Sequence, residues 1–149
     1  MPIEHTWEEF GYHKRYRGTV TGAEIVQSVR TQVADPRFAA MRYAINEYEP
    51  GAIFMVSAED IAELERIETL YGYRQRGIVI TYVTQDPALI RFLNSVYLES
   101  LMLIYPTVSE ARSRLAQILA RSAAPDPDGI LDPAVFLGTH APPMHPTQP

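Results

Sequence analysis

Ile78-Val-Ile-Thr-Tyr-Val83, with Asp86-Pro87 just downstream, is the clearest strand-then-helix signal in the chain. The run is β-branched and almost continuously apolar, which is typical of a central parallel strand covered by other elements. An aspartate before a proline is typical of a helix N-cap followed by the first helical position. We therefore predict a strand at 78–83 and a helix from residue 87 onward. The side chains expected to face inward from this helix are Leu89, Ile90, Leu93, Val96 and Tyr97.

Three further helix starts are predicted by capping boxes or close variants of them. These are Thr21-x-x-Glu24, Ser57-x-x-Asp60 and Thr107-x-x-Glu110. Each is followed by apolar residues at helical spacing, and Asp35-Pro36 ends the first helix at about residue 34. The expected inward stripes are Ile25, Val26, Val29 and Val33, then Ile61, Leu64, Ile67 and Tyr71, then Ala111, Leu115, Ile118 and Leu119.

The remaining strands are predicted at the N-terminus, at 41–48 and at 101–105. Residues 4–20 look extended, with a turn at 8–11 that makes a hairpin. The second arm of this hairpin places Tyr12, Lys14 and Tyr16 on one face. Residues 52–56 are interpreted as a short apolar connector. Because crossovers between parallel strands are right-handed, the three later strands should be parallel, beside an antiparallel N-terminal pair. The expected fold is α/β, a mixed sheet of four to five strands with four helices.

The chain of 149 residues fits one domain, which we predict at 1–122. Residues 123–149 hold seven of the twelve prolines and no basic residue, so they are predicted to form a tail that is flexible or docks on a neighbouring subunit. Docking is suggested by one apolar run in this tail, and it leads us to expect a homo-oligomer, most simply a dimer. The candidate interface residues are Ile130, Leu131, Val135, Phe136 and Leu137.

Composition excludes several classes of function. The chain has no cysteine, which excludes disulfides, thiol catalysis and cysteine-bound metals. Its net charge is −5, and no basic footprint for a nucleic acid dominates. No apolar run is long enough to span a membrane, and no secretory signal is visible, so we expect a cytoplasmic protein. The four histidines lack a metal-binding pattern, and no glycine-rich phosphate loop is present. We expect no cofactor and no metal.

Two polar groups are candidate sites, each with a simpler structural interpretation. Ser57 is a candidate phosphoacceptor, because a phosphate is electrostatically favoured at a helix N-terminus, although a plain N-cap also explains it. A candidate anion site requires the hairpin and the loop after the second helix to adjoin; otherwise its residues are solvated charges. The residues of that anion site are Arg15, Arg17, Arg74 and Arg76.

The chain also has nine tyrosines, which could line a pocket or an interface or pack in the core and its boundary. No set of serine, histidine and acid, and no other catalytic constellation, can be assembled from the sequence. We therefore expect a protein that is not an enzyme.

Order and spacing resemble the SpoIIAA-like, or STAS-type, bacterial domain over roughly residues 8–120. The resemblance is best at Leu103-Ile-Tyr-Pro-Thr107-Val-Ser-Glu110-Ala111-x-x-x-Leu115, which looks like the family's closing strand and capped helix start. Regulatory members carry an Asp-Ser or Asp-Ser-Ser-Gly element whose serine is phosphorylated to release a partner. The matching position here, Met55-Val56-Ser57-Ala58-Glu59, has the serine without that aspartate or glycine. The chain looks more like divergent standalone members whose function is generally unknown.

These observations favour a non-enzymatic regulatory or protein-interaction module. The alternative is a domain that binds a small apolar, lipid-like ligand, because the apolar content of 88–105 could line a pocket between helix and sheet. A third possibility is a phosphorylation switch at Ser57.

Overall fold

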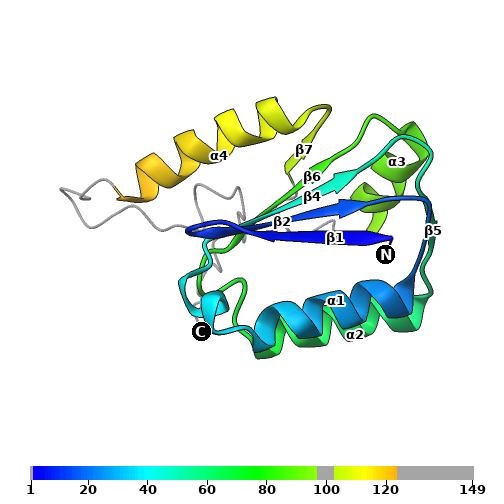
Figure 1. Ribbon diagram of the computed structural model, residues 1–149, viewed down its shortest axis with the longest axis horizontal. Helices are drawn as coiled ribbons and strands as arrows, with labels where there is room; N and C mark the ends of the chain where they lie inside the picture. The colour runs from blue at the N-terminus through cyan, green and yellow to red at the C-terminus, as the bar shows by residue number, and fades with distance from the viewer. Residues whose placement is uncertain (1, 97–102, 124–149) are drawn as a thin grey trace, which may run out of the picture.

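The computed structural model describes residues 2–96 and 103–123, and these form an α/β fold with two sheets (Figure 1). The main sheet has five strands in the order β1-β2-β4-β6-β7, and β3 and β5 form a small second sheet. The strands are β1 Ile3–Trp7, β2 Gly11–Tyr16, β3 Thr19–Thr21, β4 Tyr43–Tyr48, β5 Ile53–Met55, β6 Val79–Val83 and β7 Leu103–Tyr105. The helices are α1 Gly22–Ala34, α2 Ala58–Leu70, α3 Pro87–Val96 and α4 Val108–Ala123, with a 3₁₀ helix, η1, at Pro36–Ala40.

The main sheet is mixed in the way the sequence predicts. β1 and β2 are antiparallel, whereas β2, β4, β6 and β7 run parallel to one another. The register places Lys14 of β2 beside Asn46 of β4, and Asn46 beside Tyr82 of β6. These three side chains therefore share one face, near the carboxyl ends of their strands.

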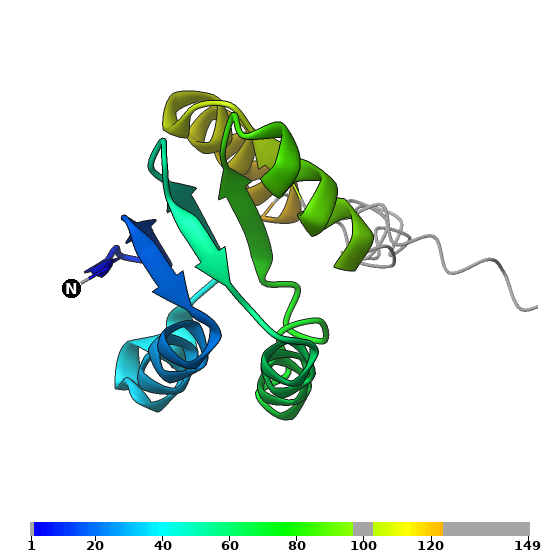
Figure 2. The same ribbon diagram turned by 90° about the vertical axis from the view of Figure 1, so that its right-hand side faces the viewer.

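Helices cover both faces of the sheet. α1 and α2 pack side by side on one face, and α4 lies on the opposite face (Figures 1 and 2). The first core joins Val26 and Val29 of α1 and Leu64 and Ile67 of α2 to the sheet. The second core joins α4 to β4 and β6 through Ile45, Val79, Val83, Ala111, Leu115 and Ile118. The two cores are separate because successive side chains of a strand point to opposite faces of the sheet.

All four predicted helix starts are confirmed. Thr21 and Ser57 each form a complete capping box, with Glu24 and Asp60 respectively as the returning carboxylates. The Asp86 carboxylate accepts a hydrogen bond from the Ala88 backbone N–H at 2.9 Å. The hydroxyl of Thr107 accepts one from the backbone N–H of Glu110 at 3.2 Å. Local hydrogen bonding within four residues explains why the sequence alone reveals these positions.

Three details of the sequence-based prediction are wrong. Residues 53–55 are a strand rather than a connector, because they pair with β3, a partner that lies 34 residues earlier in the register. Strand β4 begins at Tyr43 rather than 41, since η1 occupies residues 36–40. Tyr71 does not belong to the buried stripe of α2: it is the C-cap and is 41% exposed.

The inward stripe of α3 is confirmed only in part. Leu93 is buried, whereas Leu89, Ile90 and Val96 are half-buried. Tyr97 lies outside the described residues, as do positions 101–102 of the predicted last strand. Leu89, Leu93 and Val96 of this helix line a cavity.

Candidate functional site

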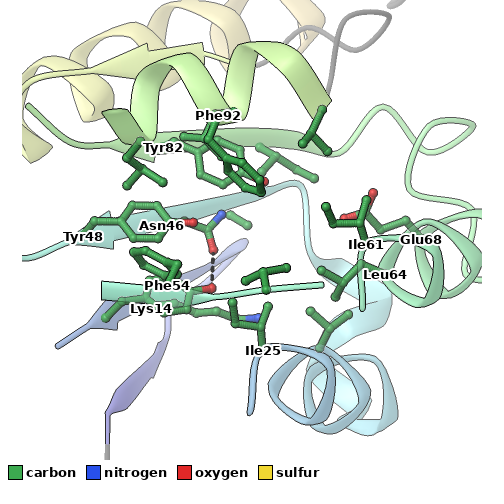
Figure 3. Close-up of a pocket in the computed structure, with 18 of the residues that line it drawn as sticks. Lys14, Ile25, Asn46, Tyr48, Phe54, Ile61, Leu64, Glu68, Tyr82 and Phe92 are labelled. Carbon is green, nitrogen blue, oxygen red and sulfur yellow. Dashed lines mark hydrogen bonds between the residues drawn. The ribbon is translucent and has the colours of Figure 1, made fainter. Parts of the chain in front are cut away.

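A cavity of about 80 Å³ lies where the carboxyl halves of β2, β4 and β6 face α1, α2 and α3 (Figure 3). Strand β5 of the small second sheet contributes Phe54, and Val56, just after the end of β5, also lines the cavity. The carboxyl ends of parallel strands are the usual place for ligand sites in α/β sheets. A single water molecule needs roughly 10–15 Å³ of such space. The cavity is therefore large enough for a small organic molecule or several waters.

Lys14 is the most unusual side chain of this cavity. It is the only lysine of the chain, it is 3% exposed, and it points from β2 into the space between the sheet and the helices α1 and α2 (Figure 3). Among residues 2–96 and 103–123 its ammonium group has no hydrogen bond and no ion pair, and its Nζ lies 5.4 Å from the centroid of the Tyr12 ring. Burial lowers the pKa of Lys14 to about 7, although the charge of Glu68 opposes this change.

Glu68 lines the same cavity from the far wall, on α2. Burial raises the pKa of its carboxyl group to about 7, while the charge of Lys14 acts in the opposite direction. Its carboxylate also lacks a hydrogen bond or ion pair within the described part of the chain. The cavity thus holds one amine and one carboxylic acid, and neither is committed to the other.

The outer wall of the cavity is aromatic. Tyr16 and Tyr48 are stacked, with ring centroids 4.7 Å apart, and the Phe54 ring meets Tyr48 edge-on at 4.6 Å. Tyr82 lies parallel to Tyr48 at 6.0 Å. Asn46 lies between Lys14 and Tyr82 in the register of the neighbouring strands, and its Oδ1 accepts a hydrogen bond from the Tyr16 hydroxyl at 3.1 Å (Figure 3). Such walls offer apolar surface with a few polar tips, as small-molecule sites do.

The opposite face of the sheet carries a network of paired charges. Arg112 of α4 binds Glu8 through two hydrogen bonds of 3.0 and 2.5 Å, and Glu8 also accepts from the Tyr43 hydroxyl. The hydrogen bond from Arg112 is the main cause of the lowered pKa of Glu8. His13 Nε2 lies 2.8 Å from Glu47 Oε2. The network ties α4 to the N-terminal hairpin, and its acids are engaged by basic groups rather than available to a ligand.

Ser57 is exposed and its hydroxyl is occupied by the capping box. Ser57 Oγ accepts from the Asp60 backbone N–H at 3.2 Å and donates to the Asp60 carboxylate at 2.8 Å. Two carboxylates, Glu59 and Asp60, lie in the same first turn. The geometry accounts for Ser57 as a cap, and its phosphorylation stays a prediction.

The structure does not bring the four arginines of the predicted anion site together. Arg15 and Arg17 lie at the carboxyl end of β2, where Arg15 pairs with Glu47 at 3.1 Å and Arg17 with Glu49 at 2.7 Å. Arg76 instead donates to the carbonyl oxygens of residues 38, 39 and 41, and its guanidinium lies over the Phe38 ring. Because residue 41 precedes the amino end of β4, the two pairs occupy opposite ends of the parallel strands. Arg74 is exposed.

The predicted interface residues Ile130, Leu131, Val135, Phe136 and Leu137 lie outside the described residues. In the described part of the chain, no cluster of three or more histidine, aspartate or glutamate side chains is arranged to hold a metal ion. Over the same residues, none of the helices combines the length and apolarity needed to cross a bilayer.

Lys14, Glu68 and Asn46 are the site residues that the sequence analysis did not identify. One signal was present: Lys14 alternates with Tyr12 and Tyr16 on one strand face, and this face proves to be the buried one. A charged residue on the core side of a strand needs a partner or a function. Glu68 gave no such signal, because only the packing of α2 beside α1 on this face of the sheet brings it to the same cavity as Lys14.

Comparison with models of known protein families finds no match, and comparison with curated proteins finds none either.

Proposed function

We propose that this chain is a binding domain for a small, mainly apolar ligand. The observation that carries the proposal is the cavity at the carboxyl ends of β2, β4 and β6, with aromatic walls and a buried lysine that has no hydrogen-bond or ion-pair partner among the described residues. An ionisable group in such surroundings costs free energy of folding, so its retention in the cavity favours a function. The apolar walls select the body of the ligand, and Lys14, Asn46 and Glu68 orient its polar group.

The position of α3 supports this proposal. Leu89, Phe92, Leu93 and Val96 line the cavity from one side, which is where the sequence suggested that a pocket would form. Phe92 is partly exposed at the same time, so α3 forms both wall and rim. A rim of this kind gives an apolar molecule a route from solvent to Lys14.

The test is a comparison of native and denatured mass on protein purified from its own host. We expect native mass spectrometry to show added mass that denaturation removes. Val56→Phe, which places a ring in the cavity, should lose this added mass. Ile53→Phe is the matched control. Ile53 is in β5, the strand that directly precedes Val56, but its side chain is 59% exposed and does not line the cavity. Native and denatured masses that both equal the mass of the bare chain would contradict ligand binding.

A protein-interaction role is the second candidate, favoured by the surface of β5. Ile53 and Met55 expose most of their apolar surface side by side on a two-stranded sheet. Exposed apolar residues on short edge strands favour pairing with another chain. Light scattering on the Ile53→Asp, Met55→Asp double variant tests it: a smaller particle than the unaltered chain supports the role, and an unchanged particle argues against self-association through β5.

The SpoIIAA-like assignment is also a proposal. Its support is the antiparallel β1–β2 pair followed by parallel strand–helix units, closed by β7 and the Thr107-capped α4. The test is an experimental structure: superposition of its sheet and helices, in the same order, on a SpoIIAA-like domain would support the assignment.

A further inference from the structure

We propose that Lys14 is a nucleophilic amine that captures small, uncharged carbonyl compounds as an imine inside the cavity. The inference rests on the ligand-binding role proposed above and names the class of ligand, an aldehyde or ketone with an apolar substituent. It also adds an activity to that role, reversible covalent capture.

The first argument is the state of the amine. Within residues 2–96 and 103–123, Lys14 Nζ has no hydrogen-bond or ion-pair partner, and the side chain is 3% exposed at a cavity wall. A lysine in an apolar pocket loses its proton readily, and the neutral amine that results is a nucleophile. No other lysine of this chain competes with it for a carbonyl compound.

The second argument is the acid across the cavity. Glu68 is held in apolar surroundings that favour its protonated form. Among the described residues its carboxyl group also has no partner, so it is available to give a proton. An amine and a carboxylic acid in one cavity are the two groups that imine formation requires.

The third argument is the lining. Tyr48, Phe54 and Phe92 surround the space with aromatic rings, which favour an apolar substituent. An uncharged carbonyl compound enters without the desolvation cost that a charged ligand must overcome. A carboxylate ligand would bind a charged Lys14 but would be repelled by an ionised Glu68, so the pair favours a neutral molecule.

The reaction balances without an oxidant or a reductant. The Nζ lone pair attacks the carbonyl carbon, and the carbonyl oxygen gains the proton that the nitrogen loses, giving a carbinolamine. Glu68 then gives its proton to the hydroxyl group, the C–O bond breaks, and water leaves. The nitrogen lone pair forms the C=N bond, which leaves a positively charged iminium facing the Glu68 carboxylate. Addition of water reverses every step.

The experiment incubates the full chain with propanal or butanone near pH 7 in the presence of sodium cyanoborohydride, which reduces an iminium to a stable amine. Intact mass and peptide mapping then locate the adduct. We expect one adduct on Lys14, with a rate that saturates as the probe concentration rises. The α-amine of the first residue serves as an internal reference, because it should react without saturation.

Five variants make the test specific. Lys14→Met should lose the internal adduct, and Val56→Phe should lose it while Lys14 is still present. Ile53→Phe should react like the unaltered chain. Glu68→Gln should slow adduct formation by roughly 10²-fold and remove the decline in rate above neutral pH, whereas Glu65→Gln, a neighbouring exposed position on α2, should not.

Reaction at the α-amine alone, or labelling of Lys14 that never saturates and survives Val56→Phe, would overturn the proposal. If butanone raises the melting temperature but leaves no adduct after reduction, covalent capture is wrong while non-covalent binding stands. If the host-purified protein carries no ligand, the proposed function fails separately, whatever the reduction experiment shows.

Discussion

Lys14 on β2 and Glu68 on α2 face one cavity from opposite walls, and no ion pair joins them (Figure 3). Each shifts the pKa of the other toward the charged form, but burial outweighs this mutual attraction for both groups. A buried pair of opposite charges that does not close into a salt bridge is a cost to folding. The cavity therefore holds two ionisable groups at a cost to stability, as functional sites commonly do.

The first prediction concerns stability at alkaline pH. The folded pKa of Lys14 is about 7, below the ordinary value of 10.5, so the unfolded chain binds more protons between these values. Lys14 should therefore make the free energy of unfolding rise with pH from 7 to 9.5, by up to about 1.4 kcal/mol per pH unit. Urea denaturation at several pH values measures this slope.

The Lys14→Met variant is the control for that slope. It should be more stable than the unaltered chain at pH 7, and its advantage should shrink as the pH rises. Other ionisable groups near Lys14 include His5, Glu68, Tyr12 and Tyr73. Burial lowers the pKa of His5, so it titrates below neutral pH, and Tyr12 and Tyr73 have pKa values raised above the range tested. Glu68, with a pKa of about 7, still loses its proton between pH 7 and 8 and opposes the rise there, so the two proteins are compared from pH 8 upward. Equal slopes in both proteins would show that Lys14 is not the group responsible.

Gly11 is predicted to be intolerant of any side chain. A Cβ atom at Gly11 would lie 2.1 Å from Cζ of Tyr43, its partner in the register of β2 and β4. Gly11→Ala should therefore displace the Tyr43 ring and destabilise the fold by about 1–3 kcal/mol. Thermal denaturation checks this, and the same change in a Tyr43→Leu background should cost clearly less. A cost that is independent of Tyr43 would contradict the steric explanation.

Ser57 is expected to act on stability through its cap. Ser57→Ala removes the hydroxyl that accepts from the Asp60 N–H, and should cost about 1 kcal/mol. Ser57→Thr keeps a hydroxyl at the same position and should cost less. Denaturant titration compares the three proteins. If Ser57→Ala leaves stability unchanged, the hydroxyl is not needed as a cap and a regulatory role becomes more attractive.

Arg76 and Arg74 should differ sharply although only one residue separates them. Arg76→Lys removes a planar group that reaches three backbone carbonyls and lies 4.5 Å from the Phe38 ring centroid. We expect a loss of about 1 kcal/mol, because an ammonium cannot reproduce this geometry. Arg74→Lys is the matched control and should be neutral. Similar effects for both would show that the contacts with η1 contribute nothing.

Most of the correctly predicted fold follows from interactions between residues that are close in the sequence. The helix starts at Thr21, Ser57, Asp86 and Thr107 depend on hydrogen bonds within a few residues, so the sequence reveals them. The parallel order of the later strands follows from the handedness of crossovers. The β3–β5 ribbon escaped prediction because three-residue strands carry almost no periodic signal and depend on a distant partner.

The candidate site was less accessible to such reasoning. The pocket's wall on α3 was anticipated from its apolar content, but the arginines selected for their chemistry lie at opposite ends of the strands. The sequence shows that these residues are basic, but it does not show which of them pair with carboxylates and which donate to backbone carbonyl groups. Lys14 was placed on the same strand face as Tyr12 and Tyr16, yet nothing in the sequence said that α1 and α2 would bury that face.

The sequence by itself determined the elements, their order and the alternation that separates the two faces of each strand. Only the tertiary structure decided that Lys14, Asn46 and Glu68 would meet around one cavity. The physical reason is range: caps and amphipathic periods act over a few residues. The burial that shifts the pKa of Lys14 and Glu68 arises instead from the packing of α1 and α2 on one face of the sheet, which brings together residues more than fifty positions apart in the chain.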